Sequence, residues 1–260
     1  MDMTKRPLIL VTNDDSIVAP GIRALVEMAN EFGEVYVVAP DGPQSGKGLA
    51  ITLDQSLRCN EVQSNGPQRE FKVSGTPADC VKLAINVVLP RRPDLILSGI
   101  NHGSNASVNV IYSGTMSAAV EGALERVNSI GFSLDEFPWT ASMESAKPYI
   151  RSIIANVLDN GLPSGVCLNV NFPANDKVPY KGLKVCRQAI GNWVEEFDSR
   201  VDPYGRPYYW LTGKYELYDQ GSDTDIAALK EGYVSLVPVS VDLTAHETIA
   251  ALNQWNFEVE

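Results

Sequence analysis

The sequence predicts an α/β fold, a Rossmann-like, doubly wound and mostly parallel sheet with helices on both faces. The first observation is that short apolar runs alternate along the chain with segments whose apolar residues recur at helical spacing. Strands that alternate with helices form parallel sheets covered on both faces, and right-handed crossovers make such a sheet doubly wound. The second observation is length, because 260 residues suit one large domain with a substantial core.

Two apolar runs begin the sheet. Residues 8–12 and 34–39 are almost entirely apolar and are expected to form buried strands. Residues 21–32 carry apolar side chains at helical spacing, which predicts an amphipathic helix between those strands. A second helix is expected at 77–89, where Thr76 is a candidate cap and a proline follows it. The remaining core elements are a strand at 95–99, a helix at 117–126 and a strand at 128–133.

Two segments interrupt this alternation. Residues 51–73 alternate in polarity and contain turn residues, which predicts an inserted hairpin. Residues 191–218 are rich in aromatics around the turn sequence at 202–205, which predicts a projecting β-hairpin arm in the C-terminal half. The aromatic side chains form either a local satellite core or a subunit-contact arm. We expect a single domain over 1–260, with its core at 7–190 and 219–240, the arm at 191–218 and a C-terminal helix at 244–258.

The bulk composition narrows the function classes. A net charge of −11 argues against tight binding to a nucleic-acid duplex. Small phosphorylated substrates remain compatible with it, because a bound cation inverts the local field. The four cysteines form no C-x-x-C pair and are expected to be reduced and mostly buried. No signal peptide or membrane-spanning run is visible, so we expect a cytoplasmic protein without a membrane partner.

Polar residues follow three of the predicted strands. Asn13, Asp14 and Asp15 come after the first strand, Ser45 after the second, and Asn101 after the strand at 95–99. Because ligands bind at the carboxyl ends of the strands in doubly wound sheets, these loops are expected to converge. The acidic pair either holds a metal or includes a helix cap. All-oxygen ligation by these carboxylate, hydroxyl and amide groups suits Mg²⁺ or Mn²⁺, with Ca²⁺ a further candidate.

A possible anion site follows the loop at 101–105. Ser113, Gly114 and Thr115 precede a predicted helix, where backbone N–H groups and the helix dipole attract anions, or where they form an ordinary capping turn. Sequence motifs of other enzymes that bind ligands at this end of such a sheet do not occur in the chain. No G-x-G-x-x-G or G-x-S-x-G occurs, and in the glycine-rich run 42–48 the residue after the lysine is Gly48 instead of Ser or Thr. These differences count against dinucleotide, α/β-hydrolase and P-loop chemistry.

The motifs together resemble the SurE-type survival-protein nucleotidases. The resemblance covers almost the whole chain, in the same order and at similar spacing, which makes the combination specific. It is carried by the sequences VTNDD at 11–15, APGI at 19–22, VVAPD at 37–41 with Ser45-Gly46, SGTPADCV at 74–81, LSGINHGSN at 97–105, SGT at 113–115, YYW at 208–210 and EGYVS at 231–235.

The resemblance implies a metal-dependent phosphatase that hydrolyses nucleoside 5′- and 3′-monophosphates, with short-chain polyphosphate as a further substrate. It implies one divalent cation per subunit, bound at Asp14, Asp15, Ser45 and Asn101. Asp14 and Asp15 are the expected catalytic residues. The expected phosphate- or substrate-binding residues are Asn13, Asn101, His102, Ser113, Gly114 and Thr115. The resemblance also implies a homodimer or homotetramer built by exchange of the arm and the C-terminal region.

Two positions depart from the family pattern. Ser16 stands where the family usually has glycine, and a serine is strained there if the backbone requires a positive φ. His102 occupies a variable position, where it either contacts phosphate or base or faces solvent. Two other functions use the same loops: a non-catalytic nucleotide sensor, which would bind without turnover, and a Rossmann-type transferase with a nucleotide-linked donor, which would need an acceptor.

Overall fold

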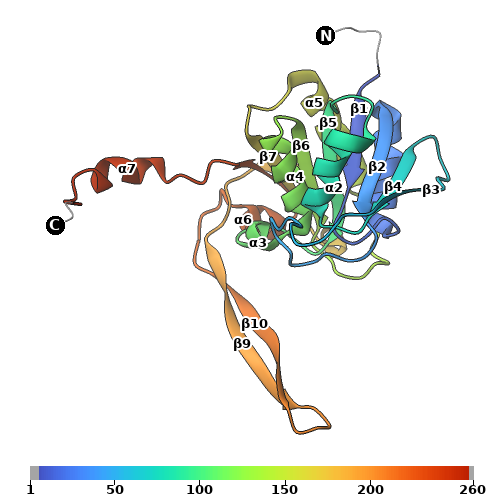
Figure 1. The fold of residues 1–260 in the computed structure, drawn as a ribbon. Helices are drawn as coiled ribbons and strands as arrows, with labels where there is room; N and C mark the ends of the chain where they lie inside the picture. The colour runs from blue at the N-terminus through green and yellow to red at the C-terminus, as the bar shows by residue number, and fades with distance from the viewer. Residues whose placement is uncertain (1–5, 258–260) are drawn as a thin grey trace.

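The computed structural model describes residues 6–257 and confirms the α/β fold class (Figure 1). Within those residues, nine strands form one sheet in the order β3-β4-β2-β1-β5-β6-β7-β11-β8, and β9 and β10 form a separate ribbon. The strands of the main sheet are β1 (Leu8–Thr12), β2 (Glu34–Pro40), β3 (Cys59–Val62), β4 (Arg69–Val73), β5 (Leu95–His102), β6 (Asn128–Leu134), β7 (Val166–Phe172), β8 (Leu183–Val185) and β11 (Val234–Ser240).

The central strands β4, β2, β1, β5, β6 and β7 are parallel to one another. Two antiparallel pairings, of β3 with β4 and of β7 with β11, extend the sheet on its two sides. The chain moves from β1 outward to β2 in one direction and, from β5 onward, in the other. The order therefore reverses between β1 and β5, and a doubly wound sheet binds its ligand at the carboxyl ends of the strands at such a reversal.

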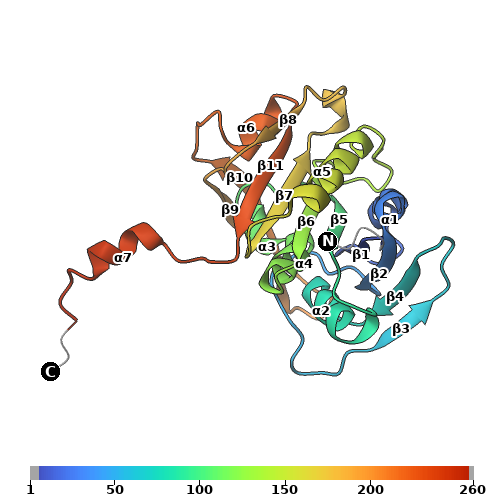
Figure 2. The same ribbon diagram turned by 90° about the horizontal axis from the view of Figure 1, so that it is seen from above.

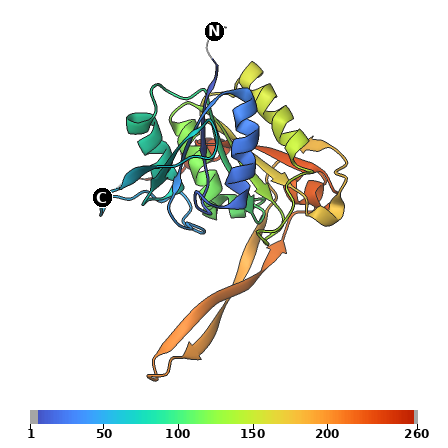
Figure 3. The same cartoon turned by 90° about the vertical axis from the view of Figure 1, so that its right-hand side faces the viewer.

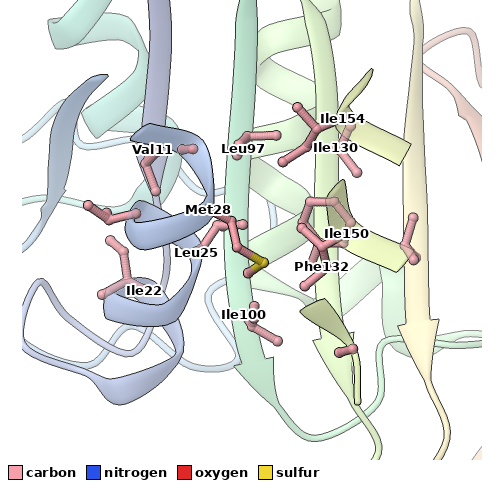
Figure 4. Packing of buried hydrophobic residues seen from close by; sticks show 14 of the residues in the cluster. Val11, Ile22, Leu25, Met28, Leu97, Ile100, Ile130, Phe132, Ile150 and Ile154 are labelled. Carbon is pink, nitrogen blue, oxygen red and sulfur yellow. The ribbon is translucent and has the colours of Figure 1, made fainter. Parts of the chain in front are cut away.

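The helices cover both faces of the sheet, with α1 and α5 on one side and α2 and α4 on the other (Figure 2). Successive side chains of β1 point to opposite faces of the sheet and so enter the hydrophobic cores on both faces. Ile9 and Val11 face α1 and α5, whereas Leu8 and Leu10 face the α2 side. All four side chains are fully buried. Figure 4 shows the core on the α1 and α5 side. The helices are α1 (Pro20–Phe32), α2 (Pro77–Leu83), α3 (Asn109–Tyr112), α4 (Gly114–Leu124), α5 (Lys147–Asn160), α6 (Asp225–Lys230) and α7 (His246–Leu252).

Several element boundaries differ from the sequence-based expectation. The helix expected at 77–89 is α2 followed by a π-helical turn over Ala84–Val88. Thr76 caps α2 as predicted, since its side chain accepts from the Asp79 backbone in a capping box. The strand expected at 95–99 continues to His102, with a register shift after Ser98. The helix α4 begins three residues earlier than expected, at Gly114, because a serine cap precedes it.

Both predicted hairpins are present. The strands β3 and β4 pair antiparallel, and β4 joins the main sheet beside β2. The arm consists of β9 (Gly191–Val201) and β10 (Pro207–Leu217), which project away from the body (Figure 3). Aromatic side chains along it stay exposed, as Tyr209 and Trp210 do at 61% each. In this chain the aromatics thus do not form a packed satellite core.

The helix α7 is shorter than the expected 244–258 and extends from the body at the C-terminal side (Figure 1); residue 258 lies outside the described part. All four cysteines are free, and three of them are buried. No helix within residues 6–257 is long and apolar enough to cross a bilayer.

The contact of α1 with β5 depends on a glycine. A Cβ atom placed on Gly21 would overlap the carbonyl oxygen of Ile100 and lie 2.9 Å from its carbonyl carbon. Because the obstacle is backbone of a central strand, it cannot rotate away. We expect Gly21→Ala to lower the free energy of unfolding by about 1–3 kcal/mol in urea denaturation followed by circular dichroism. The control is Gly42→Ala, since a Cβ at Gly42 meets nothing within 4 Å. Equal stability of the two variants would contradict this packing.

Candidate active site

The acidic pair lies where the strand order reverses. The strand β1 ends at Thr12, and Asn13, Asp14, Asp15 and Ser16 follow it, all buried. Neither aspartate caps a helix: α1 begins at Pro20, its N-cap position is Ala19, and no side chain bonds to the cap. The capping explanation of the pair is therefore wrong. A different reason is needed for two buried carboxylates next to each other in the chain.

Asp14 is held by the start of helix α4. The hydroxyl of Thr115 donates to Asp14 Oδ1 at 2.6 Å, and Gly114 packs so closely that an added Cβ would lie 2.6 Å from Asp14 Cβ. The pKa of Asp14 is raised to about 6, chiefly by burial and in smaller part by the charge of Asp15, while the Thr115 hydrogen bond opposes the shift. Gly114 and Thr115 thus fix the carboxylate in a place that disfavours its charge.

Asp15 lies beside His102. The distance from His102 Nδ1 to Asp15 Oδ2 is 3.7 Å, and the side chains are 2% and 12% exposed. The Asp15 Oδ2 atom is buried and has no hydrogen-bond partner in residues 6–257. No lysine or arginine of this part of the chain pairs with Asp14 or Asp15. A buried carboxylate oxygen without a partner is costly, so this position suits an added positive charge.

The other two expected ligands border the same end of the sheet. Ser45 is exposed and follows Gln44, whose backbone N–H donates to the Asp14 carbonyl at 2.7 Å. Asn101 is half-buried at the end of β5, and its Nδ2 donates to the Gly103 carbonyl at 2.8 Å. No hydrogen bond within the described residues joins Ser45 or Asn101 to either carboxylate. Because its Nδ2 is used in this bond, the Oδ1 atom of Asn101 is the atom that could bind a metal.

The loop after β5 is anchored by buried amides. Asn171 Oδ1 on β7 accepts from the backbone N–H of Asn105 at 2.8 Å, and Asn105 Nδ2 donates to Ser133 Oγ on β6 at 2.8 Å. Asn169 Nδ2 in turn donates to the Asn105 carbonyl at 2.9 Å. These bonds tie the segment after Asn101 to two neighbouring strands, so that its position is fixed by the sheet.

The predicted phosphate turn is also a helix cap. Ser113 is the N-cap of α4, and its Oγ accepts from the Met116 backbone at 3.0 Å. The capping explanation is therefore correct for Ser113. The hydroxyl can still donate its proton, and the positive end of the 11-residue helix α4 faces the Asp14 side of the site. Asn13 has a local role as well, since its Nδ2 donates to the Ser16 carbonyl at 2.8 Å.

The residues fit a hard divalent cation. The site offers two carboxylates with neutral oxygens around them, and residues 6–257 contain no group of three or more His, Cys, Asp or Glu placed to bind a metal. Two acids with hydroxyl and amide oxygens match the ligand preference of Mg²⁺ or Mn²⁺ and differ from that of a zinc site. The unpartnered oxygen of Asp15 is the observation that favours a cation most directly.

The chain is similar to known proteins over almost its whole length. The family model described as Survival protein SurE matches residues 9–195, well over half of the chain. The chain belongs to the SurE family. A protein named 5′-nucleotidase SurE from Christiangramia forsetii is 58% identical over 254 residues, which cover 97% of this chain and 98% of that protein. Another of the same name from Flavobacterium psychrophilum is 55% identical over 252 residues, covering 96% and 98%.

The SurE fold is also seen in a solved relative. The crystal structure of the SurE protein from Aquifex aeolicus matches with a TM-score of 0.80 at 36% identity, over 95% of this chain and 98% of that chain. Sequence reasoning found the acidic pair and its neighbours but missed contacts made by two other loops. Gln44 acts through its backbone, which no sequence pattern reveals. The contact of Trp139, after β6, with His102 was also missed, because a loop with two aromatics has no motif.

Ser16, the residue after the acidic pair, adopts a φ of 100°. A serine at this φ is strained by about 1 kcal/mol or more, and its carbonyl is fixed by Asn13. We expect Ser16→Gly to raise the free energy of unfolding by about 1 kcal/mol in urea denaturation. Ser152→Gly, in the exposed face of α5, is the control and should lower it by about 0.5 kcal/mol. A decrease in both variants would show that Ser16 carries no strain.

Proposed function

We propose that this chain is a 5′-nucleotidase, a phosphatase that hydrolyses nucleoside 5′-monophosphates to nucleoside and phosphate. The observation that carries the proposal is the buried Asp14–Asp15 pair at the strand-order reversal, with one carboxylate oxygen unpartnered. The names of its SurE relatives support the same activity. The proposal extends to nucleoside 3′-monophosphates and to short-chain polyphosphate, which present the same terminal phosphate group.

We propose that each subunit binds one Mg²⁺ or Mn²⁺ ion through Asp14, Asp15, Ser45 and Asn101. When bound, this cation supplies positive charge that stabilises the phosphate as negative charge develops in the transition state. Residues of this chain hold the proposed metal ligands in place. Thr115 and Gly114 hold Asp14 in one orientation, and the Gln44 backbone holds the loop that carries Ser45 against Asp14.

The phosphate is held by groups around the acidic pair. The Ser113 hydroxyl and the positive end of α4 offer hydrogen-bond donors and a favourable dipole to phosphate oxygens. Both carboxylates are committed to the cation, so water is the proposed nucleophile and a covalent aspartyl-phosphate is not needed. Attack by water on phosphorus forms a new P–O bond and breaks the bond to the ester oxygen. The attacking water loses one proton, and the ester oxygen gains one and leaves as the nucleoside hydroxyl.

The cation proposal is tested by chelation and by one substitution. Phosphate release from AMP should be lost in EDTA and restored by Mn²⁺ or Mg²⁺. Asp15→Asn keeps the shape but removes the charge of the unpartnered oxygen, so kcat should fall by about a hundredfold or more. Calorimetry should show weaker Mn²⁺ binding by the same variant.

Asp159→Asn is the matched control for this test, because Asp159 is an exposed residue near the end of α5. It should keep wild-type activity and Mn²⁺ affinity. Full activity of the wild-type protein in EDTA would rule out the cation. A mild loss in Asp15→Asn, with unchanged Mn²⁺ binding, would rule out its role as a ligand.

We further propose that subunits associate as a homodimer or homotetramer by exchanging the arm and the C-terminal region. The arm presents exposed aromatics such as Phe197 and Trp210, and the C-terminal segment presents Trp255 and Phe257. Exposed apolar side chains in this number are usually covered in an assembly. The cytoplasmic location expected from the sequence stays a prediction.

The arm can be removed without disturbing its base. Glu196 pairs with Thr212 across the two strands, so residues 197–211 can be replaced by an Asn-Gly turn that closes a short hairpin. We expect the variant to form a smaller assembly than the wild type, measured as molar mass by light scattering. The remaining base keeps the bond of Trp193 Nε1 to Asn109 at 2.8 Å, so the fold should persist in circular dichroism. An unchanged molar mass would contradict the arm's role.

A further inference from the structure

A short aromatic loop follows β6 and lies against the end of β5. It spans residues 135–141 and carries Phe137, which is 79% exposed, and Trp139, which is 50% exposed. Neither ring belongs to the buried core, although Ala141 and Met143 just beyond them pack into it. Exposed apolar side chains that lie together, unlike single scattered ones, can mark a ligand-binding surface. We therefore ask which ligand could contact the rings of Phe137 and Trp139.

The loop is held firmly at both ends. The Glu136 carboxylate accepts from the backbone N–H of Asn175 at 2.7 Å and from its Nδ2 at 2.9 Å. Asp135 donates its backbone N–H to the Phe172 carbonyl at 2.9 Å. At the other end Met143 is buried in the core. A tethered loop presents its rings in fixed positions, as a preorganised binding surface does.

The same loop touches the segment that follows Asn101. The rings of Trp139 and His102 have centroids 6.4 Å apart with a tilt of 32°. Phe137 packs on the next residue, since a Cβ added to Gly103 would lie 2.9 Å from its Cε1. His102 in turn lies 3.7 Å from Asp15. The contacts form a continuous path from the buried carboxylate, through His102, to the half-exposed face of Trp139.

His102 has polar atoms that nothing in the described chain satisfies. Its side chain is 2% exposed, and neither ring nitrogen has a hydrogen-bond partner within residues 6–257. A neutral imidazole has one N–H donor and one acceptor nitrogen. The Nδ1 atom lies 3.7 Å from Asp15 Oδ2, and Nε2 has no partner in the described part of the chain. A buried polar atom without a partner costs free energy that a ligand hydroxyl would recover.

We propose that His102 and Trp139 form the nucleoside subsite of this enzyme. His102 hydrogen-bonds a ribose hydroxyl, and Trp139 stacks on the nucleobase, with Phe137 supporting the backbone beneath. The inference rests on the proposed nucleotidase function, because the phosphate must sit at Asp14 and Asp15. A nucleoside monophosphate carries phosphate, sugar and base in this order, which is the order of Asp15, His102 and Trp139 along the path. The subsite makes the enzyme prefer nucleotides over phosphate esters without a base.

The test compares two substrates that differ only in the base. Full-length wild type, Trp139→Ala and Trp139→Phe, each with Mg²⁺, are assayed on AMP and on ribose 5-phosphate. Stacking on one aromatic ring changes base affinity by about tenfold or more. We therefore expect Trp139→Ala to lower the AMP to ribose 5-phosphate ratio of kcat/KM about tenfold, and Trp139→Phe to restore most of it. An unchanged ratio in Trp139→Ala would overturn the stacking role.

A second variant separates the sugar contact from the base contact. Both substrates contain ribose, so His102→Leu should lower kcat/KM for AMP and for ribose 5-phosphate by a similar factor. It should leave their ratio near the wild-type value. A loss confined to AMP would overturn the assignment of His102 to the sugar.

Adenosine binding tests the subsite without catalysis. Calorimetry with adenosine alone should give about tenfold weaker binding for Trp139→Ala than for wild type, with Trp139→Phe close to wild type. Equal adenosine affinity in wild type and Trp139→Ala would overturn the subsite whatever the activity. Adenosine binding that depends on Trp139 in a protein that releases no phosphate from AMP would support the subsite and would count against the proposed function alone.

Discussion

Two carboxylates are buried next to one another at the end of β1, and most of the site is arranged around that unfavourable placement. Burial is the largest cause that raises the pKa of Asp14, and the neighbouring charge of Asp15 raises it as well. Thr115 satisfies one carboxylate, but one oxygen of Asp15 is left without a partner among the described residues. In the proposed function, a divalent cation bound at this position offsets this cost. The same feature links the fold to the proposed phosphatase chemistry.

The scaffold holds this arrangement through the sheet itself. The reversal of strand order brings the segments after β1 and β5 to one edge, and the buried amides of Asn105 and Asn171 fix the second of them. The helix α4 contributes its first turn, and the β2 loop contributes a backbone N–H from Gln44. Each contributor comes from a different part of the chain, so the geometry depends on the whole domain.

The exposed aromatics divide into two groups. The first group lies on the arm and on the C-terminal segment, which both extend from the body (Figure 1) and thus suit contacts with another subunit. Those of the loop after β6 lie beside the site, where Trp139 contacts His102, which suits a ligand. Similar side chains thus fit different proposed roles according to the elements that carry them.

The sequence by itself determined the fold class, because apolar periodicity and turn residues are local signals. It located both hairpins, the Thr76 cap and the Asp14–Asp15 pair. It could not decide between a metal site and a cap for that pair, since the choice depends on where α1 begins. It also could not show that β5 continues to His102, that Ser16 has a positive φ, or that Trp139 meets His102. These features arise from contacts between segments far apart in the chain, and only the tertiary structure brings such segments together.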